Sequence, residues 1–331
     1  MVFVIIALFV SAFCWENPLW QDLFADDLKQ GFFADPTARV WPDDPDTLYV
    51  YPSHDVYPPR GCDLMDLYHV FSTQDVEMAN GKWVDHGIIV QATDTTTNGQ
   101  DWGRPEGGFM WAPDCVFYNG TYYFYFPHPS GSDWGSTWKI GVATSKNPSS
   151  NFKVVGYIPD VPSLIDPCVF IDDDGTPYLF IGGGNHAMYG KLNTDMVTLA
   201  GGMQDIQGLE DFHEATFVFK KDGIYYFTYS DNHEDGRDGE AGDNRLRYAT
   251  SDNINGPWQN KGIYMTPTDS YVNHGSIVQF KGRWFQFYLN SALSLITKEF
   301  NDWTRSVCVD EVFFNADGTI QVIKQTGFDA K

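Results

Sequence analysis

The chain has 331 residues, with 44 Asp or Glu against 21 Lys or Arg, so its formal net charge is −23. A charge of this sign repels phosphate polyanions and anionic lipid surfaces, and we expect neither nucleic acid nor a membrane as a partner. Aromatic residues make up 16 % of the chain, a composition that favours β-structure and also suits flat, partly apolar ligands such as sugars.

The first element in chain order is an apolar run from Val2 to Phe13. It is shorter than the roughly 20 residues that cross a bilayer, and it is typical of the core of a secretory signal. We therefore expect residues 1–14 to be a signal peptide, residues 15–331 to be a single catalytic domain, and the protein to be secreted. No basic residue precedes the run, so a mis-started N-terminus is the alternative.

From residue 31 onward, a short apolar strand, a turn and an aromatic-rich strand recur five times. Repeated hairpins of this size predict an all-β, five-bladed β-propeller. Third strands are expected after the hairpins, for example over 67–72, 138–145, 245–251 and 294–298, and a final hairpin over 307–322 would complete the ring. The expected blades are residues 31–90, 105–160, 161–209, 210–268 and 269–331.

Polar residues open the first strand of every repeat: Asp35, Asp114, Asp166, Glu214 and His274. Inner strands of a propeller run along its axis, so we expect these five side chains at one face. The second strands return to that face and end near a further set of polar residues: His54, His128, His186, His233 and Asn290. Crowded carboxylates raise one another's pKa and cost stability, which indicates function. Paired carboxylates beside aromatic side chains favour glycoside hydrolysis.

Four segments in order resemble glycoside hydrolase family 43. They are Gly-Phe-Phe-Ala-Asp-Pro (31–36), Ser-Leu-Ile-Asp-Pro (163–167), the stretch beginning His-Glu-Ala (213–230) and Asn-His-Gly-Ser-Ile-Val (273–278). The similarity extends from Asn17 to about Thr326. It implies a five-bladed propeller that inverts configuration while cleaving α-L-arabinofuranosyl or β-D-xylosyl linkages of plant cell-wall polysaccharides or oligosaccharides.

The resemblance also implies roles for individual residues. Asp35 would be the general base, Glu214 the general acid, and Asp166 the group that orients Glu214 and keeps its pKa high. No cofactor is required for this chemistry, although many relatives hold a calcium ion on the axis through water, next to the position of His274. The acid is followed by Ala-Thr where many relatives have Gly-Pro, and this departure bears on the subclass.

Trp111 resembles a residue that packs on the innermost sugar, and His54 occupies the place of a subsite side chain. Phe33 is a further candidate for substrate binding. Arg247 is expected either to reach a sugar hydroxyl or Glu214, or to form a salt bridge away from the site. Asp114 has no assigned role.

Two other functional classes remain as alternatives: a fructan-active propeller hydrolase, whose typical Asn-Asp-Pro-Asn and Arg-Asp-Pro motifs are missing here, and a glycan-binding propeller without catalysis. The sequence leaves open arabinofuranosidase against xylosidase, exo against endo action, and the oligomeric state. Apart from Cys14, the cysteines are Cys62, Cys115, Cys168 and Cys308. They lack metal-site spacing, and their pairing is open, with buried free thiols the default expectation for Cys115 and Cys168.

Overall fold

A computed structural model describes residues 17–58, 61–77, 83–133, 135–231, 245–265, 270 and 272–326. The expected signal peptide and His233 lie outside these ranges, so secretion stays a prediction. In the part of the chain that is described, no helix is long and apolar enough to cross a membrane.

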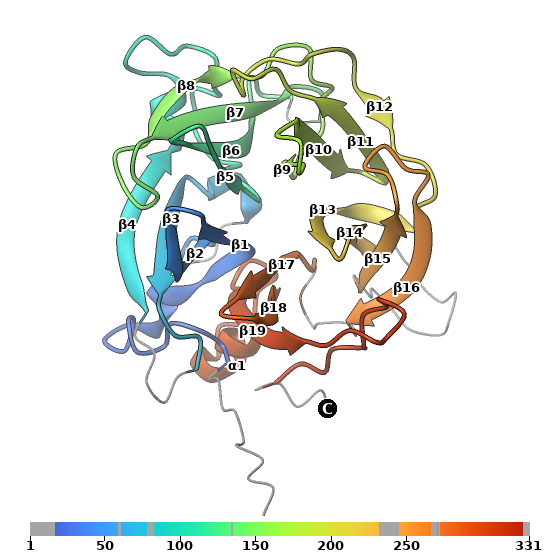
Figure 1. The fold of residues 1–331 in the computed structure, drawn as a ribbon. Helices are drawn as coiled ribbons and strands as arrows, with labels where there is room; N and C mark the ends of the chain where they lie inside the picture. Colours follow the sequence, from blue (N-terminus) through green and yellow to red (C-terminus); the bar gives the residue numbers. More distant parts are fainter. Residues whose placement is uncertain are drawn as a thin grey trace, which may run out of the picture.

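Five antiparallel sheets stand in a ring around a central axis, which confirms the predicted five-bladed β-propeller (Figure 1). Blade I contains β1 (Phe33–Trp41), β2 (Asp44–His54), β3 (Leu67–Thr73) and β4 (Val84–Gln91); blade II contains β5 (Asp114–Tyr118), β6 (Thr121–Pro129), β7 (Trp138–Ser145) and β8 (Lys153–Tyr157); blade III contains β9 (Cys168–Ile171), β10 (Pro177–Gly183), β11 (His186–Lys191) and β12 (Gln204–Asp205). Blade IV contains β13 (Phe212–Lys221), β14 (Ile224–Asp231), β15 (Leu246–Ser251) and β16 (Gln259–Met265), and blade V contains β17 (Gly275–Phe280), β18 (Arg283–Asn290) and β19 (Ser306–Val312). Short helices lie outside the sheets: η1 (Leu28–Gly31), η2 (Cys62–Leu64), η3 (Ala92–Thr95) and α1 (Ala292–Thr297).

Tight turns join the first two strands of several blades. In blade II the turn residues Asn119 and Gly120 have φ angles of 47° and 73°, and Asp222 and Gly223 of blade IV have 51° and 82°. Two consecutive positive φ angles match the right-handed twist of the flanking strands, and Asn, Asp and Gly adopt them at the lowest cost. These dipeptides therefore fix the hairpins that the sequence predicts.

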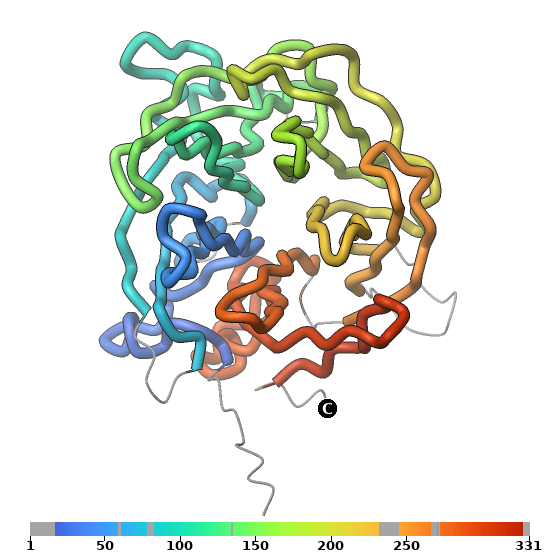
Figure 2. Tube along the Cα trace, in the orientation of Figure 1, coloured from blue at the N-terminus to red at the C-terminus, as the bar shows by residue number. Residues whose placement is uncertain are grey.

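The end of the chain differs from the prediction. Residues 294–298, expected as the third strand of blade V, fall largely within α1 (292–297). The third strand is instead β19, which the sequence had placed in a final hairpin. Both ends of the described chain then join the ring: Leu19 donates to the carbonyl of Val307 (2.8 Å), and Ile323 donates to that of Tyr264 (2.7 Å). Figure 2 shows the blue N-terminal segment beside the orange-red strands of blade V.

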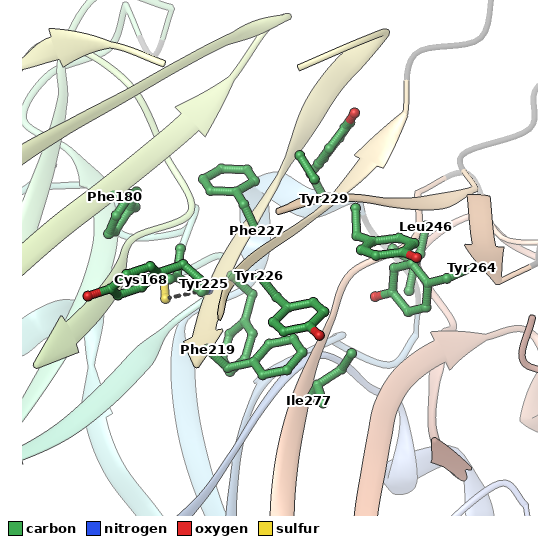
Figure 3. Close-up of a cluster of buried hydrophobic side chains, with 14 of the residues drawn as sticks. Cys168, Phe180, Phe219, Tyr225, Tyr226, Phe227, Tyr229, Leu246, Tyr264 and Ile277 are labelled. Atoms are coloured by element: carbon green, nitrogen blue, oxygen red, sulfur yellow. Dashed lines mark hydrogen bonds between the residues drawn. The ribbon is translucent and has the colours of Figure 1, made fainter. Parts of the chain in front are cut away.

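Aromatic side chains fill the space between blades. Figure 3 shows part of the cluster between blades III, IV and V, where the rings of Phe219 and Tyr226 stack with centroids 4.7 Å apart. In the same cluster the Cys168 thiol accepts a hydrogen bond from the backbone N–H of Val218 (3.3 Å). Cys62, Cys115, Cys168 and Cys308 are all free thiols, so among the described residues packing rather than disulfide bonding holds the blades together.

Candidate active site

A cavity of about 540 Å³ opens at one end of the propeller axis, and all five blades or their connections contribute to its wall. Four of the five residues predicted to open the inner strands line it: Asp35, Asp166, Glu214 and His274. The volume lies in the range of small-ligand sites. The sequence pattern thus brings three carboxyl groups and an imidazole into one cavity.

The backbone around these carboxyl groups is strained. Asp35 and Asp166 both have a φ of 50°, and Ala215, next to Glu214, has a φ of 67°. Left-handed conformations cost non-glycine residues about 1–2 kcal/mol each, and such outliers concentrate at functional sites. Asp35 and Asp166 are each followed by proline, whose ring restricts the backbone of the residue before it.

Asp35 is buried and held from two sides. Its carboxylate accepts hydrogen bonds from the Ser53 hydroxyl (2.5 Å) and from Nη1 of Arg305 (3.1 Å). Arg305 also contacts both carboxylate oxygens of Asp55, at 2.9 and 2.8 Å. Burial raises the pKa of Asp55, although the neighbouring guanidinium opposes the shift. Arg305 therefore carries its charge deep in the site, next to Asp35.

Asp166 and Glu214 form the opposite side of the site. The backbone N–H of Ala215 donates to Oδ2 of Asp166 (2.7 Å), and the Thr216 hydroxyl donates to the Asp166 carbonyl. Burial, and secondly the charge of Glu214, hold the pKa of Asp166 well above its usual range. Burial also raises the pKa of Glu214, which the nearby His213 counteracts. These two carboxyl groups consequently favour their protonated forms.

His274 lies beside this pair, with Nδ1 3.8 Å from Oδ2 of Asp166. Burial lowers the pKa of His274 to about 4, so its imidazole is neutral at physiological pH. A neutral imidazole is a metal ligand. Among the residues described here, however, no group of three or more His, Cys, Asp and Glu side chains is placed to hold a metal ion.

Trp111 belongs to the cavity wall, as the sequence predicts. Its indole packs at a tilt of 45° against that of Trp138, with ring centroids 4.7 Å apart, and its Nε1 donates to the carbonyl of Cys62 (3.0 Å). Phe109 packs against both indoles. The wall between blades I and II therefore offers a fixed aromatic surface, the type of surface on which a sugar ring packs.

Three other residues predicted to bind substrate do not line the cavity. Arg247 donates to Asp231 (2.9 Å) and Asp211 (3.2 Å), which is the salt-bridge alternative. His54 lies between the rings of Phe33 and His69, at 4.7 and 5.7 Å, and burial lowers the pKa of His54 to about 4. Phe33 is 1 % exposed and belongs to the core.

The predicted second ring of histidines also forms only in part. His186 lines the cavity, whereas His128 is buried and accepts a hydrogen bond from the backbone of Arg104. Asn290 is buried too, and its Oδ1 accepts from the backbone N–H of Ala292. Of the second-strand ends that the structure describes, the side chains of His128 and Asn290 are buried and that of His54 packs against Phe33, so these three lie within the blades.

Asp114 points away from the cavity and into the tunnel. Its Oδ1 lies 2.6 Å from Nη2 of Arg39, and its Oδ2 accepts from the backbone of Val169 (2.7 Å). The sequences around Cys115-Val-Phe and Cys168-Val-Phe match when Asp114 is set opposite Pro167. Asp114 is therefore one position further along its strand than Asp166, and this shift by one residue directs its side chain elsewhere.

Residues 29–320 match the model of the glycosyl hydrolases family 43. The chain belongs to this family. It is therefore a glycosidase, which confirms the resemblance seen in the sequence. Among relatives of the family, a xylosidase/arabinosidase from Bacteroides ovatus is 30 % identical over 88 % of this chain and 95 % of its own length.

A second relative, xylosidase/arabinosidase 43A from Humicola insolens, is 30 % identical over 87 % of this chain and 96 % of its own length. Among solved structures, a β-xylosidase/α-arabinofuranosidase of the family from a compost microbial metagenome superposes with a TM-score of 0.75. It is 29 % identical, and the match covers 89 % of this chain and 95 % of that one. That protein was solved with xylotriose in a calcium-free form.

Proposed function

We propose that this family 43 glycosidase cleaves α-L-arabinofuranosyl or β-D-xylosyl linkages of hemicellulose with inversion of configuration. The observation that carries the proposal is the contrast between the two sides of the cavity. Asp35 lies against the Arg305 guanidinium, whereas burial raises the pKa of Glu214 and Asp166. A carboxylate held by a cation, in the same cavity as a carboxyl group that keeps its proton to higher pH, is the arrangement that acid–base cleavage of a glycosidic bond needs.

In the proposed reaction, Asp35 accepts a proton from a water molecule as that water attacks the anomeric carbon. Glu214 gives its proton to the glycosidic oxygen as the bond to the leaving group breaks. Asp166 does not exchange a proton; it fixes the backbone of Ala215 and thereby the position of Glu214. Inversion requires room for the water, and we expect the two carboxyl groups to be roughly 6.5–9.5 Å apart.

The proposed substrate class rests on two sources, the names of the relatives and the aromatic wall of the cavity. The relatives are named as xylosidases and arabinosidases, and one solved neighbour holds xylotriose. Trp111 and Trp138 would pack on the apolar face of a pentose. A calcium ion beside His274, held mainly through water, and secretion of the protein both belong to the proposal.

The test compares 4-nitrophenyl α-L-arabinofuranoside with the corresponding β-D-xyloside for the wild type, Glu214→Gln and Asp35→Asn. General acid–base groups contribute about 10²–10⁴-fold, so we expect kcat/KM of Asp35→Asn to fall by that factor on these substrates. Nitrophenolate leaves without much protonation, so for Glu214→Gln the same fall is expected on an unactivated xylo-oligosaccharide or arabino-oligosaccharide, on which this variant is judged. Glu106→Gln, an exposed substitution of the same type, is the control. Full activity of either site variant would refute its assigned role, and a wild type that cleaves neither substrate would refute the substrate class.

Product stereochemistry is a separate readout. Proton NMR during the first minutes of hydrolysis should show the anomer opposite to that of the substrate, before mutarotation mixes the two. Retention would contradict single displacement even if the substrate class is right. The pattern of products from xylan and arabinoxylan then distinguishes exo from endo action.

A further inference from the structure

The first strand of blade IV is irregular where it reaches the cavity. In its pairing with β14, the register shifts between Phe212 and Glu214 and again between Glu214 and Phe217. Ala215 in this stretch has a φ of 67°. In a regular strand, neighbouring side chains point to opposite faces, and bulges of this type redirect them. As a result, both His213 and Glu214 line the cavity.

The two side chains are close and only partly exposed. His213 Nε2 lies 3.9 Å from Oε2 of Glu214, with side-chain exposures of 26 % and 18 %. The carbonyl of His213 accepts a hydrogen bond from the backbone of Asn185 (3.1 Å), which anchors this residue to blade III. An imidazole fixed so near the proton donor is neither a core histidine nor a freely solvated one.

We propose that His213 is a positioning residue that acts electrostatically on Glu214 and sets the alkaline limit of activity. The inference rests on the proposed role of Glu214 as general acid. At 3.9 Å, an imidazolium at position 213 stabilises the carboxylate that remains when Glu214 has given up its proton.

Other charged groups face the same pair. Asp35 of β1 disfavours a negative charge on Glu214, and Arg305, before β19, favours one. The charge of Glu214 in turn raises the pKa of Asp166, before β9. On the wall next to His213, His186 of β11 is paired with Asp205 of β12 at 2.8 Å. Of the groups that lower the pKa of Glu214, His213 has the largest effect. Replacing His213 should therefore change the pH profile measurably despite the other charges.

A charge series at position 213 tests the inference. The readout is the pH dependence of kcat/KM on an unactivated substrate such as a xylo-oligosaccharide, since a poor leaving group needs the general acid. His213→Gln removes the cation, so Glu214 holds its proton to higher pH and the alkaline limb should move up by about one pH unit. His213→Lys keeps a fixed cation, and its limb should lie at or below that of the wild type.

His86→Gln, on the outer strand β4 with its ring bonded to Ser72, is the matched control and should leave the profile unchanged. Thermal unfolding checks that each variant is folded, and His213→Asn replaces the glutamine variant if needed. A neutral variant whose limb stays at or below the wild-type position, or neutral and cationic variants that shift together, would overturn the inference. Glu214→Gln separates the two proposals, because full activity in that variant would instead refute the acid itself.

Discussion

At the scale of single residues, the site holds carboxyl groups in buried positions, where their ionised forms lower the stability of the protein. Asp166 is 3 % exposed, and burial raises the pKa of both Asp166 and Glu214. A buried carboxyl group contributes to stability while it is protonated, below its ordinary pKa. That contribution is lost as the pH rises through the raised value. The native state is thus expected to lose stability from this pair as the pH rises from the ordinary carboxyl pKa through the raised values.

Glu214→Gln should therefore have opposite effects on activity and stability. The amide has the shape of the protonated acid but cannot ionise, so the variant should unfold at a higher denaturant concentration than the wild type at pH 7–8. Near pH 4, where glutamic acid is largely protonated in both states, the difference should disappear. Urea titrations across this pH range measure the effect. A variant less stable than the wild type at pH 8 would contradict the assignment of a raised pKa.

The sequence alone indicated some of the residues that meet at the site but not all of them. Asp35, Asp166, Glu214 and His274 could be found because a repeat places each of them at the start of an inner strand. Arg305 could not, because it follows no motif and reaches Asp35 across 270 positions of the chain. The position of Arg305 beside Asp35 becomes apparent only in the folded propeller.

At the scale of elements, hydroxyl groups join neighbouring inner strands beside the carboxyl groups that line the cavity. The Ser276 hydroxyl, at the start of β17, donates to the carbonyl of Pro36 and accepts from the backbone of Ala38, both at 2.8 Å. Thr216 of β13 donates to the carbonyl of Asp166 in the same way. Each contact fixes the backbone at or next to one of the two cavity aspartates, Asp35 and Asp166.

Ser276→Ala should lower stability by about 1–3 kcal/mol, because it leaves a buried carbonyl and a buried N–H without a partner. It should also lower kcat/KM, since the segment that carries Asp35 loses its attachment to blade V. Denaturant unfolding and kinetics measure the two effects. Ser136→Ala, which removes an exposed hydroxyl bonded to Asp133, is the control. An unchanged kcat/KM together with the stability loss would restrict Ser276 to a structural role.

The prediction of elements was wrong where local sequence is ambiguous. Residues 294–298 form a short run in which only Leu295 and Ile296 are apolar, and periodicity in so short a run does not distinguish a strand from a helix. In the structure, Ser294 donates to the carbonyl of Thr304, so the short helix packs on the segment before β19. Tertiary contacts with a strand that comes later in the chain decided this element, and those contacts are not readable from the run itself.

At the scale of the whole molecule, one side chain connects most of the ring. Arg39 of β1 forms an ion pair with Asp114 of β5, and its guanidinium lies 4.8 Å from the ring centre of Phe217 of β13. Its Nη2 is also 4.0 Å from Sγ of Cys168 in β9. The inner strands of four blades therefore meet at a single guanidinium, and the aspartate without an assigned role is its counter-ion.

Removing either partner of this ion pair should destabilise the propeller as a unit. Loss of one member of a buried pair costs about 3–5 kcal/mol, because the other charge stays buried without compensation. We therefore expect Arg39→Met and Asp114→Asn each to shift the urea midpoint strongly. The double variant should cost less than the sum of the two, with a coupling energy of about 0.5–3 kcal/mol.

The ion pair Lys221–Asp222 provides a control double-mutant cycle, because the Asp222 side chain is 79 % exposed. Lys221→Met and Asp222→Asn should couple by less than about 1 kcal/mol. If the Arg39 and Asp114 effects add without coupling, the guanidinium does not hold the blades through Asp114. If the two effects couple, and spectroscopic probes placed on the inner strands of different blades all report the same urea midpoint, the axial ion pair stabilises the ring as a single cooperative unit. The reason is that its loss then also lowers the stability of blades to which neither Arg39 nor Asp114 belongs.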